Sequence, residues 1–232
     1  MKVNLKAITP NAEVNIVEIA RVSSSRIDKS EKPEGLINYL IKNKHWSPFE
    51  HSFLTFDIVT SKAIGIQLLR HRSFTFQEFS QRYSKVENLE PFDLRKQAET
   101  NRQSSTEKIG WIGVTRTLGN AIEWEKELEG CKELMEQTRD YLYNGLKLYE
   151  ALLDYGVAKE CARMILPMST QTTIYMTGSV RSWIHFLDIR DDAHAQLEVQ
   201  LIAKEIKRLF IEHLPIISKA KGYDNQSIQT PA

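Results

Sequence analysis

The sequence predicts an α+β fold in which a central, mostly antiparallel sheet is flanked by helices. Strand-like segments are separated by helical segments of unequal length, which is not the regular series of a parallel α/β sheet. In addition, apolar residues from Ala121 to about Gly156 recur every three or four positions, the pattern of one long amphipathic helix. Together these two observations favour helices packed beside a sheet.

The N-terminal elements follow from local signals. Residues 3–8 alternate polar and apolar side chains and predict a first strand, and residues 12–21 predict a short helix. Ser30 and Pro33 indicate the start of a second helix, because proline suits the first turn. Its apolar residues recur at helical spacing within 36–41.

The central part of the chain alternates strand and helix signals. Residues 49–60 are rich in aromatic and β-branched side chains and alternate in polarity, which predicts a strand. Ser61 is a suitable N-cap for a helix over 62–70. Residues 79–86 look extended, and the polar stretch 88–120 predicts a long loop of the kind that serves as a lid or a family insertion.

The C-terminal part predicts two further helices around a strand, and then a last helix. Residues 158–166 favour a short helix and residues 172–177 a strand. A helix begins after Ser179, and the last helix covers 193 to about 213. The polar tail 222–232 is expected to be loose.

Composition describes an ordinary globular protein and excludes several classes. The 232 residues are 41% apolar and 26% charged, which suits one large domain or two small ones, and a single domain over 1–232 is our expectation. The formal net charge of +1 argues against a broad surface for binding nucleic acid. No apolar run approaches the length of a membrane span, and Cys131 and Cys161 form no CxxC pair. These features favour a reducing, cytoplasmic location.

The most informative stretch is Gln67–Ser84, QLLRHRSFTFQEFSQRYS, with its adjacent Arg70, His71 and Arg72. Several basic side chains that fan from one helix end suit a polyanionic ligand, although a solvated basic turn is the alternative for any single Arg-His-Arg. Two more polar clusters occur. They are His45, Ser47, Glu50 and His51, and then Arg163, Ser179, Arg181, His185, Arg190 and His194.

Other kinds of site are poorly supported. The spacing of His45, Glu50 and His51 matches no HExxH pattern, so no metal site is expected. No glycine-rich phosphate loop is present, so arginines would have to hold any nucleotide phosphate. A nucleophilic Ser80 with His71 as its base lacks the GxSxG elbow, and a hydroxyl that binds phosphate or backbone is the better interpretation.

The arginines belong to a longer pattern. Arg70-His71-Arg72, seven residues and then Ser80 resemble the RHR-x7-S signature of the flavin-dependent thymidylate synthases. Further blocks resemble the family in order and approximate spacing. They are ARVS at 20–23, HWSPFEH at 45–51, ARMILP at 162–167 and RSWIHFLDIRDDAHAQLEVQ at 181–200.

The resemblance implies an enzyme that converts dUMP to dTMP. It further implies methylenetetrahydrofolate as carbon donor, FAD as redox carrier, NADPH as reductant, and a homotetramer whose subunits share active sites. By position, the implied FAD contacts are Ser23, His45, Ser47, Glu50, Arg70, His71, Arg72, Ser73, Ser179, Arg181, His185, Ile189 and His194. The implied dUMP contacts are Gln67, Arg70, Glu78, Ser80, Gln81, Arg82, Arg163 and Arg190.

Within this resemblance, Arg190 is the expected activating residue. Uracil C5 is a poor nucleophile, and a guanidinium beside the pyrimidine would stabilise the ring ionised at N3. A cysteine attack on the ring is not expected, because Cys131 lies on the apolar stripe of the long helix and nothing beside Cys161 suggests an activated thiolate. The rival from another class is a nucleotide- or RNA-binding module whose arginines merely hold phosphates.

Overall fold

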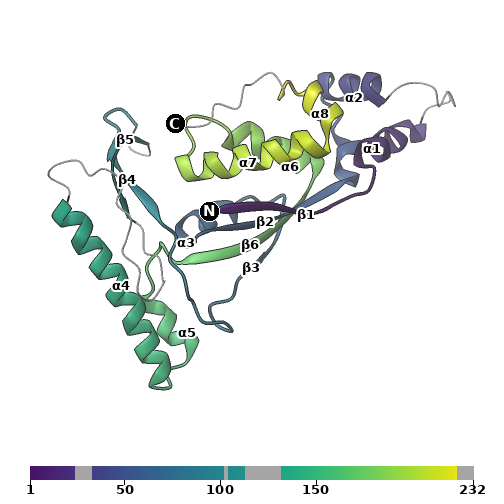
Figure 1. The fold of residues 1–232 in the computed structure, drawn as a ribbon. Coiled ribbons are helices and arrows are strands. Elements are labelled where there is room, and N and C mark those ends of the chain that lie inside the picture. The colour runs from purple at the N-terminus through teal and green to yellow at the C-terminus, as the bar shows by residue number, and fades with distance from the viewer. Residues whose placement is uncertain (24–32, 102–103, 113–131, 224–232) are drawn as a thin grey trace. The chain divides into compact units, whose positions relative to one another are not determined.

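The computed structural model describes residues 1–23, 33–101, 104–112 and 132–223 (Figure 1). One sheet has four strands in the order β1 (Lys2–Ile8), β2 (Phe53–Ser61), β6 (Gln171–Ser179) and β3 (Thr75–Glu78). A second sheet consists of β4 (Phe92–Gln97) and β5 (Ser105–Ile112). The larger sheet is antiparallel and the rest of the described chain is mainly helical, so the predicted α+β class is confirmed.

The chain divides into two compact units, which are described separately. The first unit comprises Met1, Val59–Arg70 and Gln77–Ile174. The second comprises Lys2–Ile58, His71–Phe76 and Tyr175–Ala232. The division falls within strands β2, β3 and β6, and the expectation that residues 1–232 act as one domain stays a prediction.

The N-terminal elements of the second unit match the sequence patterns, with one correction. Its elements are β1 (Lys2–Ile8), α1 (Ala12–Ala20), the 3-10 turn η1 (Arg21–Ser23), α2 (Pro33–Lys42) and the 3-10 turn η2 (Ser47–His51). The strand expected over 49–60 begins only at Phe53. Pro48 has a fixed φ that suits the start of a helical turn, and the Phe49 amide donates to the Trp46 carbonyl at 3.0 Å.

Two strands end in a serine that is the N-cap of the following helix. Strand β2 (Phe53–Ser61) leads into α3 (Lys62–Leu68), and β6 (Gln171–Ser179) leads into α6 (Val180–Arg190). The Ser61 hydroxyl accepts from the Ile64 amide at 3.3 Å, as predicted for this residue. In the same way, the Ser179 hydroxyl accepts from the Ser182 amide at 3.2 Å. Each cap fixes where its helix starts.

The core of the second unit is aromatic. Trp183 is fully buried and contacts Phe56 and Phe74 edge to face, with ring centroids 4.7 and 4.6 Å apart. Helix α7 (Leu197–His213) contacts both β1 and α6, and α8 (Pro215–Ala220) contacts α2 and α7 (Figure 1). This packing holds α6, which carries several candidate site residues, against the core.

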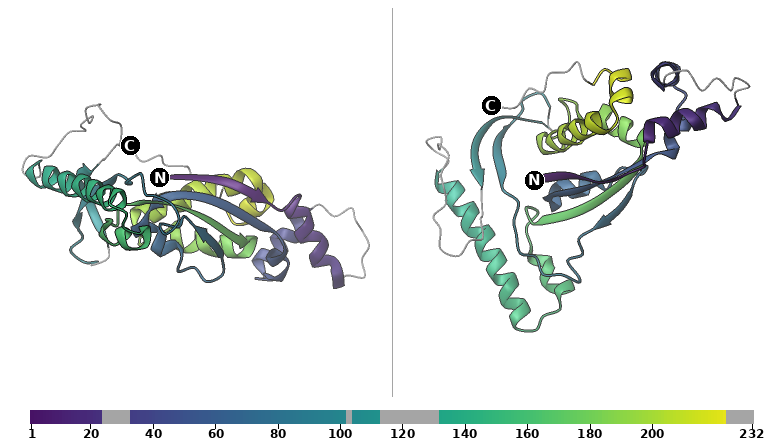
Figure 2. Two further views of the ribbon diagram at one scale, coloured as in Figure 1. Left: turned by 90° about the horizontal axis from the view of Figure 1, so that it is seen from below. Right: turned by 45° about the vertical axis from the view of Figure 1, so that its right-hand side comes forward.

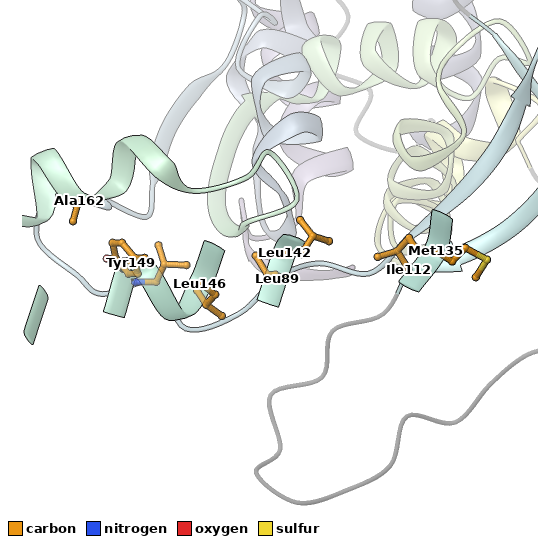
Figure 3. Packing of buried hydrophobic residues seen from close by; sticks show 8 residues of the cluster. Leu89, Ile112, Met135, Leu142, Leu146, Tyr149 and Ala162 are labelled. Carbon is orange, nitrogen blue, oxygen red and sulfur yellow. Dashed lines mark hydrogen bonds between the residues drawn. The ribbon is translucent and has the colours of Figure 1, made fainter. Parts of the chain in front are cut away.

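The first unit is built on the long helix α4 (Lys132–Asp154), followed by α5 (Lys159–Ala162) and the 3-10 turn η3 (Arg163–Ile165). Leu142, Leu146 and Tyr149 of α4 are buried together with Leu89 and Ile112 (Figure 3). The amphipathic helix is therefore confirmed over its described part. The apolar stripe predicted from the sequence also included Leu134 and Tyr141, which are exposed, and Leu128 and Cys131, which lie outside the described residues.

The region between β2 and α4 departs most from the sequence expectations. The strand β3 covers Thr75–Glu78 rather than 79–86, because the Tyr83 and Ser84 amides turn back to donate to the Ser80 carbonyl. The stretch expected as a loop over 88–120 contains β4 (Phe92–Gln97) and β5 (Ser105–Ile112), which pair antiparallel and run side by side (Figure 2). Residues 113–120 lie outside the described residues.

The C-terminal helices also differ in their bounds. The helix expected over 158–166 is divided into α5 and η3, and the last long helix begins at Leu197 rather than at residue 193. Tyr223, at the start of the tail expected to be loose, is buried and donates a hydrogen bond to Asp188 Oδ1 at 3.1 Å. Residues 224–232 lie outside the described residues.

Candidate active site

A pocket of about 330 Å³ lies in the second unit, between η2 and α6. Four of the residues implied as FAD contacts border it: Glu50, Ser73, Arg181 and His185. The remaining lining residues are Trp46, Ser182, Ile184 and Asp188. An aromatic ring, an arginine and several hydroxyl groups suit a ligand that combines flat apolar rings with anionic groups.

A hydrogen-bond network fixes the wall of this pocket. The Glu50 carboxylate accepts from the Ser179 hydroxyl at 2.6 Å and from Arg181 Nη1 at 2.8 Å. Ser179 is itself buried as the cap of α6, so η2 and the first turn of α6 are joined at one carboxylate. Arg181 remains about half exposed, so its guanidinium can also face a ligand.

The other end of α6 carries the residue implied as activating. Arg190 Nε donates to His71 Nε2 at 3.0 Å. Burial, and then the charges of Arg190 and His185, together lower the pKa of His71 from 6.5 to about 4. His71 is therefore neutral at pH 7 and can accept this hydrogen bond. The Nη nitrogens of Arg190 make no hydrogen bond with the described residues, so they can serve a ligand.

The residues implied as dUMP contacts, apart from Arg190, lie in the first unit. They are Gln67 in α3, Arg70 just after it, Glu78 in β3, Ser80, Gln81 and Arg82 in the following turn, and Arg163 in η3. Two of these side chains are held within the unit. Glu78 Oε1 accepts from Lys62 Nζ at 2.6 Å and from Thr172 Oγ1 at 2.9 Å, and Arg82 pairs with the exposed Glu160 at 3.3 Å.

Several implied FAD contacts do not border the pocket. His45 is exposed and its ring packs edge to face on Tyr39, with centroids 5.8 Å apart. His194 is exposed and pairs with Asp192 at 2.7 Å. The others outside the pocket lining are Ser47, Arg70, His71, Arg72, Ser179 and Ile189, and the Ser23 side chain lies outside the described residues.

Trp46 and Asp188 line the pocket but were not among the candidate residues from the sequence. Asp188 follows Arg181 and His185 at positions i+7 and i+3, so helical spacing alone would have placed it on the same face. Trp46 lies between the candidate residues His45 and Ser47, and this position in the HWSPFEH block is the sequence signal that could have identified it. Both residues therefore belong to the lining of this pocket, of which the sequence pattern identified only a part.

The described residues contain neither a metal cluster nor a membrane span. No group of three or more His, Cys, Asp or Glu side chains there is arranged to hold a metal ion. Within the same residues, no helix combines the length and apolar character that crossing a membrane requires.

The chain resembles known proteins over most of its length. The family model described as thymidylate synthase complementing protein matches residues 4–216. The chain belongs to this family. It is 42% identical over 211 residues to a probable flavin-dependent thymidylate synthase of Paramecium bursaria Chlorella virus 1, which covers 90% of each chain. It is also 39% identical over 210 residues to the flavin-dependent thymidylate synthase of Synechocystis, covering 88% of this chain and 87% of the relative.

A third flavin-dependent thymidylate synthase, from Thermosipho melanesiensis, is 35% identical over 210 residues. It is matched over 88% of this chain and 82% of its own length. The family and the enzyme class implied by the RHR-x7-S signature are therefore confirmed. The individual ligand contacts stay predictions, and the structure supplies their surroundings.

Proposed function

We propose that this protein converts dUMP to dTMP, with FAD as redox carrier, methylenetetrahydrofolate as carbon donor and NADPH as reductant. The observation that carries the proposal is the environment of Arg190 in a chain of this family. Its Nε is held by a neutral His71 while its Nη nitrogens make no hydrogen bond with the described residues. Such a guanidinium is oriented and still free to bind an anion.

The side chains around the pocket of the second unit fit a flavin nucleotide. Arg181 offers a cation for a pyrophosphate, Trp46 offers an aromatic face, and Ser73 and Ser182 offer polar contacts. We therefore assign FAD binding to this pocket and to the other residues implied by the family pattern. Hydride transfer to the carbon delivered by the folate is the chemistry that bound FAD would supply.

The residues of this chain have to bind dUMP and activate its ring. Arg82, Arg163 and Ser80 are proposed to hold the phosphate, because arginine forks and hydroxyls suit phosphate oxygens. Arg190 is proposed to stabilise the pyrimidine ionised at N3, whose proton passes to solvent water, and the negative charge left on the ring increases electron density at C5. Ser80 then serves as a binding residue and not as a nucleophile.

We also propose that the chain works as a homotetramer in the cytoplasm and as one catalytic domain. Helix α4 supports self-association. Leu134, Tyr141, Leu148 and Tyr155 recur at every seventh residue in and just after it, with exposed fractions of 58%, 67%, 55% and 90%. A repeated apolar stripe of this kind is typical of a helix face that packs on another helix.

The test combines a spectrum with a turnover assay. Purified protein should show the absorbance of bound flavin or take up added FAD, and should form dTMP from dUMP with the folate and NADPH. Arg190→Ala should keep the flavin and lose at least about a hundredfold in kcat, the scale of removing one charge-stabilising donor. Arg208→Ala, which alters an exposed arginine paired with Glu205 on α7, should keep full activity.

The results separate the enzyme from a module that only binds nucleotides. Protein that binds dUMP but neither binds flavin nor forms dTMP would contradict the proposal and favour the binding module. Full activity of Arg190→Ala would instead keep the reaction and refute the role of this arginine.

A further inference from the structure

Among its described lining residues, the pocket of the second unit has two acidic side chains, Glu50 and Asp188. Glu50 accepts from Arg181 and from the Ser179 hydroxyl, so its charge is met within the wall. An unpaired carboxylate beside it would repel a ligand with anionic groups and offset the attraction of Arg181. The way in which Asp188 is neutralised therefore affects which ligands the pocket accepts.

Asp188 is paired by the residues that follow α8 (Pro215–Ala220). Its Oδ2 accepts from Lys221 Nζ at 2.9 Å, and its Oδ1 accepts from the Tyr223 hydroxyl at 3.1 Å. Burial, and then the charge of Asp188, raise the pKa of Tyr223, so its hydroxyl stays protonated and can donate. Glu50 and Asp188 thus each accept from one cation and one hydroxyl.

The chain turns sharply at the end of α8, and this turn brings both donors to α6. Gly222 has a φ of 71°, the left-handed conformation that glycine adopts readily and that commonly ends a helix. Its amide donates to the Lys219 carbonyl at 3.0 Å, and the Tyr223 amide donates to the Ser218 carbonyl at 2.9 Å. Because Tyr223 is also buried, its hydroxyl is held beside Asp188.

The exposure of the ion pair indicates a role beyond stability. The Lys221 side chain is 17% exposed and that of Asp188 is 45% exposed. An ion pair with a half-exposed partner contributes little to the free energy of unfolding, because water already solvates the charge. The pair does change the charge of the pocket wall. Without Lys221, the Asp188 carboxylate would border the pocket with no cation to compensate it.

We propose that Lys221 and Tyr223 are positioning residues for this pocket, which neutralise and hold Asp188 so that the pocket accepts an anionic ligand. The inference rests on the proposed function only for the identity of that ligand, FAD. The contacts of Asp188 and its place in the pocket lining do not depend on that function.

The first test is titration of the full-length, flavin-free protein with FAD. At about 0.1 M salt, Lys221→Met should weaken FAD binding about tenfold, because the Asp188 charge is then unpaired. At about 1 M salt, where the screening length falls to about 3 Å, the loss should shrink to about twofold. Lys221→Arg keeps the charge and should stay within about twofold of wild type. Lys219→Met, which removes the same charge from an exposed position on α8, is the matched control and should bind FAD like wild type.

Variants of Asp188 separate charge from packing. Asp188→Asn removes the negative charge and leaves Lys221, so it should bind FAD about threefold more tightly than wild type. Asp188→Asn combined with Lys221→Met should bind FAD within about twofold of wild type, because no charge is left unpaired. If Lys221 only supports packing, the double variant should bind FAD as weakly as Lys221→Met does.

Inorganic pyrophosphate is the second probe, because it carries anionic phosphates like those of FAD without the flavin. Its binding is measured through the shift in Tm that it causes. If wild type takes up no flavin but binds pyrophosphate more tightly than Lys221→Met does, the inference stands while the proposed function fails. If wild type forms dTMP and Lys221→Met binds FAD equally well, the proposed function stands and the inference fails.

Further outcomes would overturn the inference. One is a loss of FAD affinity in Lys221→Met that neither high salt nor Asp188→Asn reduces, which would indicate a packing role for Lys221. Another is a wild type that binds neither FAD nor pyrophosphate. If Lys221→Met does not fold, Asp188→Asn alone decides, and weaker FAD binding in that variant would show that the Asp188 charge favours the ligand.

Discussion

Two properties of the His71 side chain depend on each other. It accepts a hydrogen bond from Arg190, and burial with nearby positive charge lowers its pKa to about 4. A protonated imidazole could not accept this bond and would repel the guanidinium. The low pKa of His71 thus keeps the imidazole neutral, and available as the acceptor for Arg190, well below physiological pH.

The pKa of His71 predicts a pH dependence of stability. Above pH 6.5 the imidazole is neutral in both the folded and the unfolded chain and contributes no pH dependence. Between pH 6.5 and about 4, only the unfolded chain binds the proton, so the free energy of unfolding should fall as the pH falls. Urea unfolding of wild type and His71→Gln across this range measures it, and the variant should show the shallower slope. Identical slopes would show that the folded imidazole titrates normally.

For single residues, the sequence predicted which side chains belong to the candidate site better than it predicted their hydrogen-bond partners. The RHR-x7-S pattern marked Arg70, His71 and Ser80. It could not show that His71 accepts from Arg190, because that contact joins residues 119 positions apart. It also could not assign Glu50 a double role toward Ser179 and Arg181, since such networks depend on how η2 and α6 pack.

At the scale of elements, strand β6 is placed against the core by a glycine. A Cβ atom built on Gly178 would lie 2.4 Å from the ring of Phe74, whose side chain also packs on Trp183. No real side chain tolerates this distance, so any substitution must displace the aromatic ring. Gly178 thus sets the spacing between β6 and the segment His71–Phe76.

Gly178→Ala should therefore destabilise the protein by about 1–3 kcal/mol, the usual cost of overpacking a core. The matched control is Gly35→Ala in α2, where nothing lies within 4 Å of the added atom. Because alanine favours a helix over glycine, the control should gain up to about 1 kcal/mol. Thermal unfolding compares the two variants, and a neutral Gly178→Ala would show that the Phe74 ring moves freely.

The two serine caps give a second pair of matched variants. Ser61→Ala and Ser179→Ala should each cost about 1 kcal/mol in the free energy of unfolding, because each removes the acceptor for one helix amide. Only Ser179 also donates to Glu50, which lines the pocket assigned to FAD. Titration with FAD should therefore show weaker binding for Ser179→Ala alone. Equal FAD affinity in the two variants would separate the cap of α6 from the flavin site.

Elements with strong local signals were predicted well, and those fixed by distant pairing were not. Pro33 and Ser61 mark helix starts within one residue, because proline geometry and N-capping act locally. The strands β4 and β5 lie in a polar stretch, and their pairing is irregular between Leu94 and Gln97. Alternation is weak in such strands, so their existence depends on the partner strand and on packing beside α4.

At the scale of the whole molecule, the candidate residues form two groups, one in each compact unit. The residues that border the pocket assigned to FAD lie in the second unit, and the proposed phosphate-binding arginines Arg82 and Arg163 lie in the first. Sequence blocks alone could not show this separation, because both units are assembled from several segments of the chain. The proposed sharing of active sites among subunits makes assembly a requirement for activity.

The exposed stripe of α4 provides the test of assembly. Leu148→Glu places a charge among exposed apolar side chains at the centre of the stripe, where burial against a second copy would desolvate it. The variant should sediment as smaller species than wild type and lose dTMP formation, while its far-UV circular dichroism stays unchanged. Lys147→Glu, on the neighbouring charged flank of α4, is the control and should leave assembly intact. A Leu148→Glu protein that sediments like wild type would refute this face as the subunit interface, because a glutamate cannot remain buried and unpaired there without cost.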